Sequence, residues 1–357
     1  MADPSASQLF EELGGWPGVL RELAAGRNLS SDHARESLLR VLDGSATEAQ
    51  TAAFIFGLKV KGESSDEVAG LVQAMLAAAS PLELDEPSDI LDIVGTGGSA
   101  ALGGRAFNVS TMSALVATGA GATVCKHGNR KASSSSGSTD LLEELGVAVE
   151  LDGPGVSRCV RETGLGFAFA RVFHPSMRFA APVRAQLGVP TVFNLLGPLS
   201  HPGHVGRQLI GIADPRLTSL VAEALLARGV RKAWVVNGDS SIDELTTTGP
   251  NVVIEVADGR IRTFEVDAAD YGFARVDLSD LGVGDHHDNA RVARGVLGGE
   301  AGIFRDMVVL NAGAGLVVAG VADELATGIE LATASIDSGR AAEVLDRVVE
   351  VSRAAGG

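Results

Sequence analysis

The sequence has few cysteines and few aromatic residues. Its two cysteines, Cys125 and Cys159, form no CxxC pair and have no metal-ligand spacing. We therefore expect two reduced thiols, and neither a disulfide framework nor a zinc site. Aromatic residues make up 4% of the 357 residues, whereas hydrophobic residues make up 45%. The core is thus expected to consist mainly of Ala, Val, Leu and Ile, as in an ordinary soluble helical or α/β protein.

Positive charge and long apolar runs are also scarce. The chain has 29 Lys and Arg against 45 Asp and Glu, a formal net charge of −16. Nucleic-acid binders usually need a broad basic face, so we expect no nucleic-acid partner, whereas a small anion needs only a local positive pocket. No segment reaches the roughly 18 apolar residues of a membrane span, and the N-terminus lacks the features of a signal peptide. These absences predict a cytoplasmic protein with no membrane partner.

Residues 1–82 carry only helical patterns and are expected to form a small helical domain. Thr47 with Gln50, and Ser64 with Glu67, have the spacing of capping boxes, each followed by apolar residues at helical intervals. This segment is therefore expected to be a helical bundle.

Residues 88–357 are expected to form a larger α/β domain. The segments DILDIVGTGG, ATVCKHG and VRKAWVVNGDSS are apolar strands that end in polar or glycine-rich loops. Helices expected at 111–120 and 218–227 precede two of them, so we predict a mostly parallel central sheet flanked by helices. Asp258-Gly259 predicts a hairpin, and helices are expected at 308–319 and 329–355. Ligands of such sheets bind beyond the carboxyl ends of the strands.

The loop that begins at Gly95 has the composition of an anion site. Its glycines let backbone N–H groups approach a ligand, and Asn108, Ser110 and Thr111 follow where the next helix is expected to begin. An ordinary turn followed by a helix cap explains the same residues.

The second loop, KHGNRKASSSSGSTD, concentrates positive charge in an acidic chain. Lys126 suits a phosphate, His127 and Asn129 offer directional hydrogen bonds, and the hydroxyls of 133–138 could surround an anion. The alternative is a solvated surface loop.

Two further features suit a metal and a carboxylate. Asp243 and Glu244 follow a strand and offer the oxygen ligands that Mg²⁺ prefers, although acidic residues are also common at helix N-termini. Arg184 could bind a ligand carboxylate through its planar fork. It could equally be a surface charge or part of a structural ion pair.

Several motifs, and their order along the chain, resemble those of the anthranilate phosphoribosyltransferase family. They are GTGG, NVST, KHGNR with the serine run, FHPSM, FNLLGPL and DEL. The resemblance covers nearly the whole chain. It implies a helical domain, completed by helices near 174–200, joined to an α/β domain. It also implies a homodimer formed through the helical domains, and transfer of phosphoribosyl from phosphoribosyl pyrophosphate to anthranilate in tryptophan biosynthesis.

The resemblance assigns roles to individual residues. Lys126 and Arg184 would be catalytic. Phosphoribosyl pyrophosphate would be held by Gly95, Gly98, Ser99, Asn108, Ser110, Thr111, Lys126 and Ser138. Anthranilate would be contacted by Gly95, His127, Asn129, Met177 and Arg184. Two Mg²⁺ ions would be held through Ser110, Asp243 and Glu244.

The first loop departs from the family pattern. Ser99 stands where the family usually has aspartate, and the stretch through Arg105 is longer. This departure leaves open the alternative that the protein is a phosphoribosyltransferase acting on another aromatic acid in secondary metabolism. A non-catalytic paralogue that binds a phosphorylated ligand is a further alternative, although the intact Asp243-Glu244 pair speaks against it. A pyrimidine nucleoside phosphorylase would lack KHGNR followed by this serine run.

Overall fold

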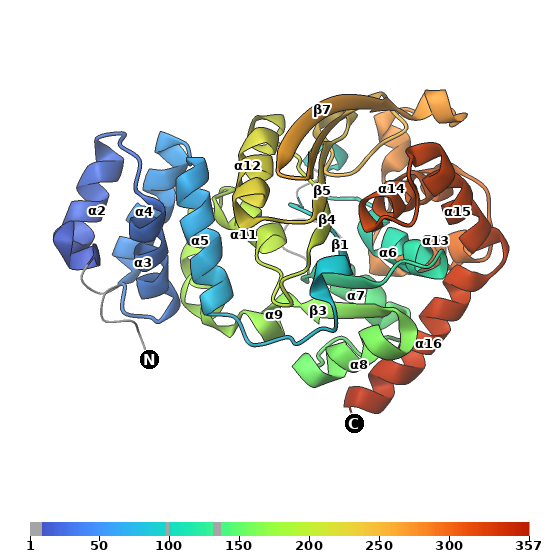
Figure 1. Ribbon diagram of the computed structural model, residues 1–357, viewed down its shortest axis with the longest axis horizontal. Coiled ribbons are helices and arrows are strands. Elements are labelled where there is room, and N and C mark those ends of the chain that lie inside the picture. Colours follow the sequence, from blue (N-terminus) through green and yellow to red (C-terminus); the bar gives the residue numbers. More distant parts are fainter. Residues whose placement is uncertain (1–8, 98–99, 131–136, 357) are drawn as a thin grey trace. The chain divides into compact units, whose positions relative to one another are not determined.

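The computed structural model describes residues 9–97, 100–130 and 137–356. The chain divides into two compact units (Figure 1). Met1–Ser80 and Phe173–Pro202 form the first unit, and Pro81–Val172 and Gly203–Gly357 form the second.

The first unit is helical. Its elements are α2 (Gly15–Ala24), α3 (Ser31–Leu42), α4 (Glu48–Lys61), α5 (Ser65–Ala77), η3 (Pro175–Phe179), α10 (Ala181–Leu187) and α11 (Phe193–Leu199). Helix α3 packs on α5, and α2 packs on α4. Both predicted capping boxes are confirmed, at Thr47 before α4 and at Ser64 before α5. Local sequence signals therefore determine where these two helices begin.

A buried carboxylate ties the helices of the first unit together. Glu67 on α5 is fully buried and accepts hydrogen bonds of 2.9 Å from the Leu29 backbone N–H and 2.8 Å from Lys61 Nζ on α4. The Lys61 side chain is itself only 4% exposed. Because a buried charge is costly without a partner, this ion pair makes the three segments depend on one another.

The second unit is built on the predicted, mostly parallel sheet. In chain order its strands are β1 (Leu91–Gly95), β2 (Val124–Gly128), β3 (Leu165–Phe169), β4 (Arg207–Gly211), β5 (Lys232–Asn237), β6 (Pro250–Ala257) and β7 (Arg260–Asp267). Their spatial order is β3-β2-β1-β4-β5-β6-β7. The first five run parallel, and β6 and β7 form the predicted antiparallel hairpin. Its turn has positive φ at both Asp258 and Gly259, as a type I′ turn requires.

Helices flank this sheet. They are α6 (Val109–Gly119), α7 (Ser138–Glu144), α8 (Gly153–Thr163), α12 (Thr218–Arg228), α13 (His286–Leu297), α14 (Ile303–Ala319), α15 (Leu325–Asp337) and α16 (Arg340–Gly356). The short helix α9 (Ala170–Phe173) follows β3. Short 3₁₀ turns connect them: η1 (Pro87–Asp89), η2 (Ala100–Leu102), η4 (Pro215–Leu217), η5 (Asp239–Ser241), η6 (Ala268–Tyr271) and η7 (Leu278–Leu281). Helices α6 and α14 pack on β1, whereas α12 packs on β5 and β6 from the other side of the sheet (Figure 1).

The prediction of a single helix at 329–355 is wrong. The chain forms α15 and α16 instead, which are separated at Ser338 and Gly339. Gly339 has a φ of 81°, a left-handed conformation that ends α15 and that glycine adopts without strain.

The core of the second unit is aliphatic, as the composition predicts. Residues of α6 and α14 such as Leu115, Val116 and Leu310 are fully buried. Both cysteines are buried and free. Among the helices of the described residues, none has the length and apolar character needed to cross a membrane.

Candidate functional site

The candidate site lies at the carboxyl ends of the parallel strands. Strand β1 has β2 on one side and β4 on the other, so the direction of strand succession reverses there. In open α/β sheets such a switch point opens a crevice for ligands. Gly95 ends β1 opposite Gly211, which ends β4. The predicted glycine loop therefore begins at the position where a ligand site is expected.

Asp243 reaches this switch point from the segment after β5. Its Oδ2 atom accepts a hydrogen bond of 2.8 Å from the Gly97 backbone N–H. A Cβ atom on Gly95 would lie 2.3 Å from that oxygen, and a Cβ on Gly211 would lie 1.5 Å from the Asp243 carbonyl oxygen. Only glycine at both strand ends allows Asp243 to approach so closely.

The Asp243-Glu244 pair is costly to bury as two negative charges. Burial is the main cause that raises the pKa of Asp243, and burial together with the neighbouring Asp243 raises the pKa of Glu244 well above its ordinary value. Asp243 and Glu244 lie between η5 and β6, where the chain forms no helix, so the alternative of an acidic helix N-terminus does not apply. A bound divalent cation would offset the cost of both charges, and paired carboxylate oxygens are the donors that Mg²⁺ prefers.

Lys126 is buried and lies in the middle of β2, so the loop expected to begin at Lys126 begins only after Gly128. Lys126 Nζ donates hydrogen bonds to the carbonyl oxygens of Ile93, at 2.9 Å, and His127, at 3.3 Å. Burial lowers the pKa of Lys126, while Asp92, Glu244 and Asp243 act in the opposite direction. Lys126 is thus a buried cation in the electrostatic field of the two acidic residues that follow β5.

His127 and Asn129 differ in their surroundings. His127 is buried, and its backbone N–H donates a 3.0 Å hydrogen bond to Asp92 Oδ1. Asn129 is exposed, and its carbonyl oxygen accepts a 3.2 Å hydrogen bond from Ser138 Oγ at the start of α7. A Cβ on Gly128 would lie 2.5 Å from the same Ser138 oxygen. Lys126, Gly128 and Ser138 together line a small pocket.

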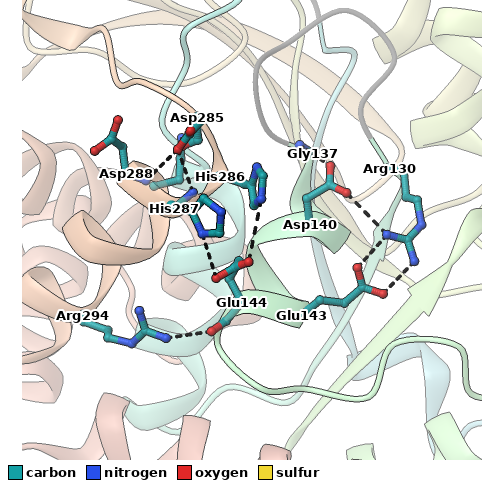
Figure 2. A network of polar contacts seen from close by, with 11 residues as sticks. Arg130, Gly137, Asp140, Glu143, Glu144, Asp285, His286, His287, Asp288 and Arg294 are labelled. Atoms are coloured by element: carbon teal, nitrogen blue, oxygen red, sulfur yellow. Dashed lines mark hydrogen bonds and ion pairs between the residues drawn. The ribbon is translucent and has the colours of Figure 1, made fainter.

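The Arg130 side chain is ion-paired with residues of α7. It forms ion pairs with Asp140 and Glu143 on α7, at 3.4 and 2.6 Å (Figure 2). The Glu143 hydrogen bond is the largest cause that raises the pKa of Arg130. The solvated-loop alternative is therefore wrong for 126–128, which lie in β2, and is not supported for Arg130 and Ser138, which are ion-paired or hydrogen-bonded.

Asn108, Ser110 and Thr111 lie at the start of α6, close to the predicted boundary. The Asn108 side chain donates a 3.1 Å hydrogen bond to Asn289 Oδ1 on α13 and does not cap the helix. Ser110 is half-buried. Thr111 is fully buried, and its hydroxyl has no hydrogen-bond partner among the described residues. The first turn of α6 thus leaves backbone N–H groups available to an anion.

Met177 and Arg184 belong to the first unit. Both are half-buried, on η3 and α10 respectively. The Arg184 guanidinium lies over the ring of Phe193, 5.1 Å from its centroid. Burial lowers the pKa of Arg184. Within 9–97, 100–130 and 137–356 no carboxylate pairs with it, so the ion-pair alternative is not supported.

Gly98, Ser99 and 133–136 of the serine run lie outside the described residues. Three supporting side chains were missed by the sequence reasoning. Asp92 holds the His127 backbone, Asn289 holds Asn108, and Asn311 holds both backbone groups of Leu245, at 3.0 and 2.8 Å. Each lies at least 35 positions from its partner, so no local pattern could have identified it.

Comparisons with known proteins agree with this arrangement. Residues 17–79 match "Glycosyl transferase family, helical bundle domain", and residues 87–342 match "Glycosyl transferase family, a/b domain". The chain is 49% identical to an anthranilate phosphoribosyltransferase of Nocardioides, over 94% of this chain and 98% of that one.

Two solved structures are similar to this chain over nearly its whole length. The anthranilate phosphoribosyltransferase of Thermus thermophilus has a TM-score of 0.87 at 41% identity, covering 94% of this chain and 99% of that one. The Saccharomyces cerevisiae enzyme, in complex with PRPP and Mg, has a TM-score of 0.85 at 28% identity, covering 95% and 98%.

Proposed function

Because the chain belongs to the glycosyl transferase family that includes the anthranilate phosphoribosyltransferases, we propose that it has their activity. It transfers phosphoribosyl from phosphoribosyl pyrophosphate to the amine of anthranilate and releases pyrophosphate, a step of tryptophan biosynthesis. The observation that carries the proposal is the Asp243-Glu244 pair beside buried Lys126. Asp243 is buried and hydrogen-bonded to the glycine loop, and Glu244 is half-buried next to it.

The phosphoribosyl donor is bound by the second unit. Backbone N–H groups after β1 and in the first turn of α6 suit its phosphate oxygens, and Lys126 supplies positive charge. Its binding residues are Gly95, Gly98, Ser99, Asn108, Ser110, Thr111, Lys126 and Ser138.

The acidic pair fits Mg²⁺. Asp243 and Glu244 hold one ion, and Ser110 is the proposed contact for a second. When bound, Mg²⁺ neutralises charge on the pyrophosphate group. Lys126 provides further stabilisation of the charge that develops on the leaving group.

The acceptor is bound through its carboxylate. Arg184 is a half-buried guanidinium without a paired carboxylate in the described part of the chain, which suits a bidentate interaction with anthranilate. The other proposed contacts are Gly95, His127, Asn129 and Met177.

The reaction is a displacement at the anomeric carbon of the ribose. The C–O bond to pyrophosphate breaks and its electron pair leaves with pyrophosphate, while the amine nitrogen forms the new C–N bond and then loses a proton. An aryl amine is neutral near pH 7, so the attack needs no strong base, and positioning supplies much of the catalysis.

The activity is tested by the loss of anthranilate fluorescence on addition of phosphoribosyl pyrophosphate and Mg²⁺. The wild type should turn over, and a double variant Asp243→Asn, Glu244→Gln should lose at least about a hundredfold in rate, since both metal-binding charges are removed. Asp258→Asn, at the exposed tip of the hairpin, is the control that removes one negative charge elsewhere. Equal rates in the wild type and the double variant would refute the metal role.

The proposed enzyme is a cytoplasmic homodimer formed through the helical unit. Phe56 and Val60 on α4 support this assignment, because they are 47% and 70% exposed and lie one turn apart. Sedimentation of the wild type and a Phe56→Lys, Val60→Lys variant tests it: a dimer that the variant weakens is expected, and a monomeric wild type would contradict it.

A further inference from the structure

Two helices of the second unit bring together a pair of histidines and a glutamate. His286 and His287 begin α13, and Glu144 ends α7 (Figure 2). His286 Nε2 lies 3.7 Å from Glu144 Oε1, and His287 Nδ1 lies 3.2 Å from Glu144 Oε2. All three ligand atoms lie within 4.8 Å of one another. None of these residues has a role in the proposed transfer reaction.

From this geometry we infer that Glu144, His286 and His287 form a site for a divalent transition-metal ion of the Zn²⁺ class, which clamps α7 to α13. Zinc binds imidazole nitrogen and carboxylate oxygen at about 2.0–2.2 Å, so ligand atoms of a tetrahedral site lie about 3.4 Å apart. The separations of 3.7 and 3.2 Å, each to a different oxygen of Glu144, lie close to that value. A set of two imidazoles and one carboxylate also binds transition metals in preference to Mg²⁺ or Ca²⁺.

The charges around the site act in both directions. The dipole of α13 disfavours positive charge, but Asp285 caps this helix and Asp288 lies in its first turn, so both offset the dipole. Asp285 Oδ1 accepts hydrogen bonds from the backbone N–H groups of His287 and Asp288. Two cations approach from the same helix. Arg291 is paired with Asp288 at 3.2 Å, and Arg294 donates to the Glu144 carbonyl oxygen at 2.7 Å.

The site lies between two supports of the candidate active site. Helix α7 begins at Ser138 and holds Arg130 through Asp140 and Glu143 (Figure 2). Helix α13 carries Asn289, which holds Asn108. A metal that joins these helices would restrain both supports together. The metal site itself does not rest on the proposed function, so the test measures metal binding and not turnover.

The test is Zn²⁺ titration of the full-length protein by calorimetry, in excess Mg²⁺ so that oxygen-only sites are occupied. The visible spectrum of bound Co²⁺ reports the coordination. The wild type should bind one Zn²⁺ tightly. Glu144→Gln or His287→Ala should weaken binding at least about tenfold, and His286→Ala with His287→Ala should abolish it. His33→Ala is the matched control, since His33 also lies in the first turn of a helix.

The outcomes separate this site from the acidic pair. Binding that survives Asp243→Asn, Glu244→Gln but is lost in the histidine double variant supports the inference. Binding lost only in the acidic variant overturns it, as does a wild type that binds no Zn²⁺ at micromolar concentration. Circular dichroism of each variant checks folding. Zn²⁺ should raise the thermal midpoint of the wild type and of His33→Ala, but not that of the variant that lacks both His286 and His287.

Discussion

Asp243 Oδ2 accepts a 2.8 Å hydrogen bond from the Gly97 backbone N–H, which joins segments 146 positions apart in the sequence. This bond connects the loop after β1 to the acidic pair after β5. It fixes one carboxylate oxygen over the switch point of the sheet, where a diphosphate and its metal are expected.

The first prediction concerns the glycine beneath this carboxylate. In Gly95→Ala the new Cβ would lie 2.3 Å from Asp243 Oδ2, so Asp243 must move. We expect kcat/KM to fall at least about tenfold and the Mg²⁺ requirement to rise, because the carboxylate is displaced from its fixed position. Initial rates across a Mg²⁺ series measure both effects. Gly282→Ala is the control, since its Cβ would meet no atom closer than 3.7 Å. An unaltered Mg²⁺ profile in Gly95→Ala would count against the assignment.

Arg184 should affect the acceptor and not the donor. Arg184→Ala removes a charged hydrogen-bond donor whose interaction with the carboxylate should contribute about 2 kcal/mol of binding free energy. KM for anthranilate should therefore rise roughly thirtyfold. KM for phosphoribosyl pyrophosphate should stay within about twofold. Arg178→Ala is the matched control. The Arg178 guanidinium also lies over an aromatic ring, 4.7 Å from the centroid of Phe179, but this side chain is exposed. If the two KM values changed in parallel, the carboxylate role would be wrong.

Asp92 should make stability depend on pH. Its carboxyl is fully buried, and burial raises its pKa from 3.8 to about 7. The folded state therefore favours the protonated form. That contribution to stability is fully present below about pH 4 and is lost as the pH rises through 7, by at most about 4 kcal/mol.

The isosteric variant Asp92→Asn cannot ionise. The free energy of unfolding of the wild type, minus that of the variant, should thus fall between pH 4 and pH 8. Denaturant titrations at several pH values provide this difference. Curves that remain parallel would show that the carboxyl keeps an ordinary pKa in the folded protein.

Glu67 should be essential to the helical unit. Glu67→Ala leaves Lys61 buried without its partner and removes the acceptor of the Leu29 N–H group, so we expect a loss of about 3–5 kcal/mol in unfolding free energy. Glu22→Ala breaks the exposed ion pair with Arg27 and should leave the unfolding midpoint unchanged. Similar midpoints for both variants would contradict the structural role of Glu67.

Local signals were sufficient for much of the fold. The capping boxes at Thr47 and Ser64, the Asp258-Gly259 turn and the alternation of strands with helices all have short-range physical causes, and the structure confirms them. The break at Gly339 was missed because apolar periodicity continues on both sides of it, and a lone glycine inside such a pattern is often tolerated.

The site was less accessible to sequence reasoning. Lys126, Asp243 and Gly95 could be named, because they lie in or after predicted strands and carry suitable chemistry. What holds them could not be predicted, since the hydrogen bonds of Asn289 to Asn108 and of Asn311 to Leu245 join helices to distant loops. Such contacts depend on tertiary packing, which a single sequence does not display.

The central claim is that anthranilate is the acceptor. Its most direct test compares kcat/KM for anthranilate with that for other aromatic acids, at saturating phosphoribosyl pyrophosphate and Mg²⁺, with pyrophosphate release as the common readout. The account predicts that anthranilate is the preferred acceptor and that one pyrophosphate is released for each anthranilate consumed. A higher kcat/KM for another aromatic acid, or no pyrophosphate release with anthranilate, would contradict it.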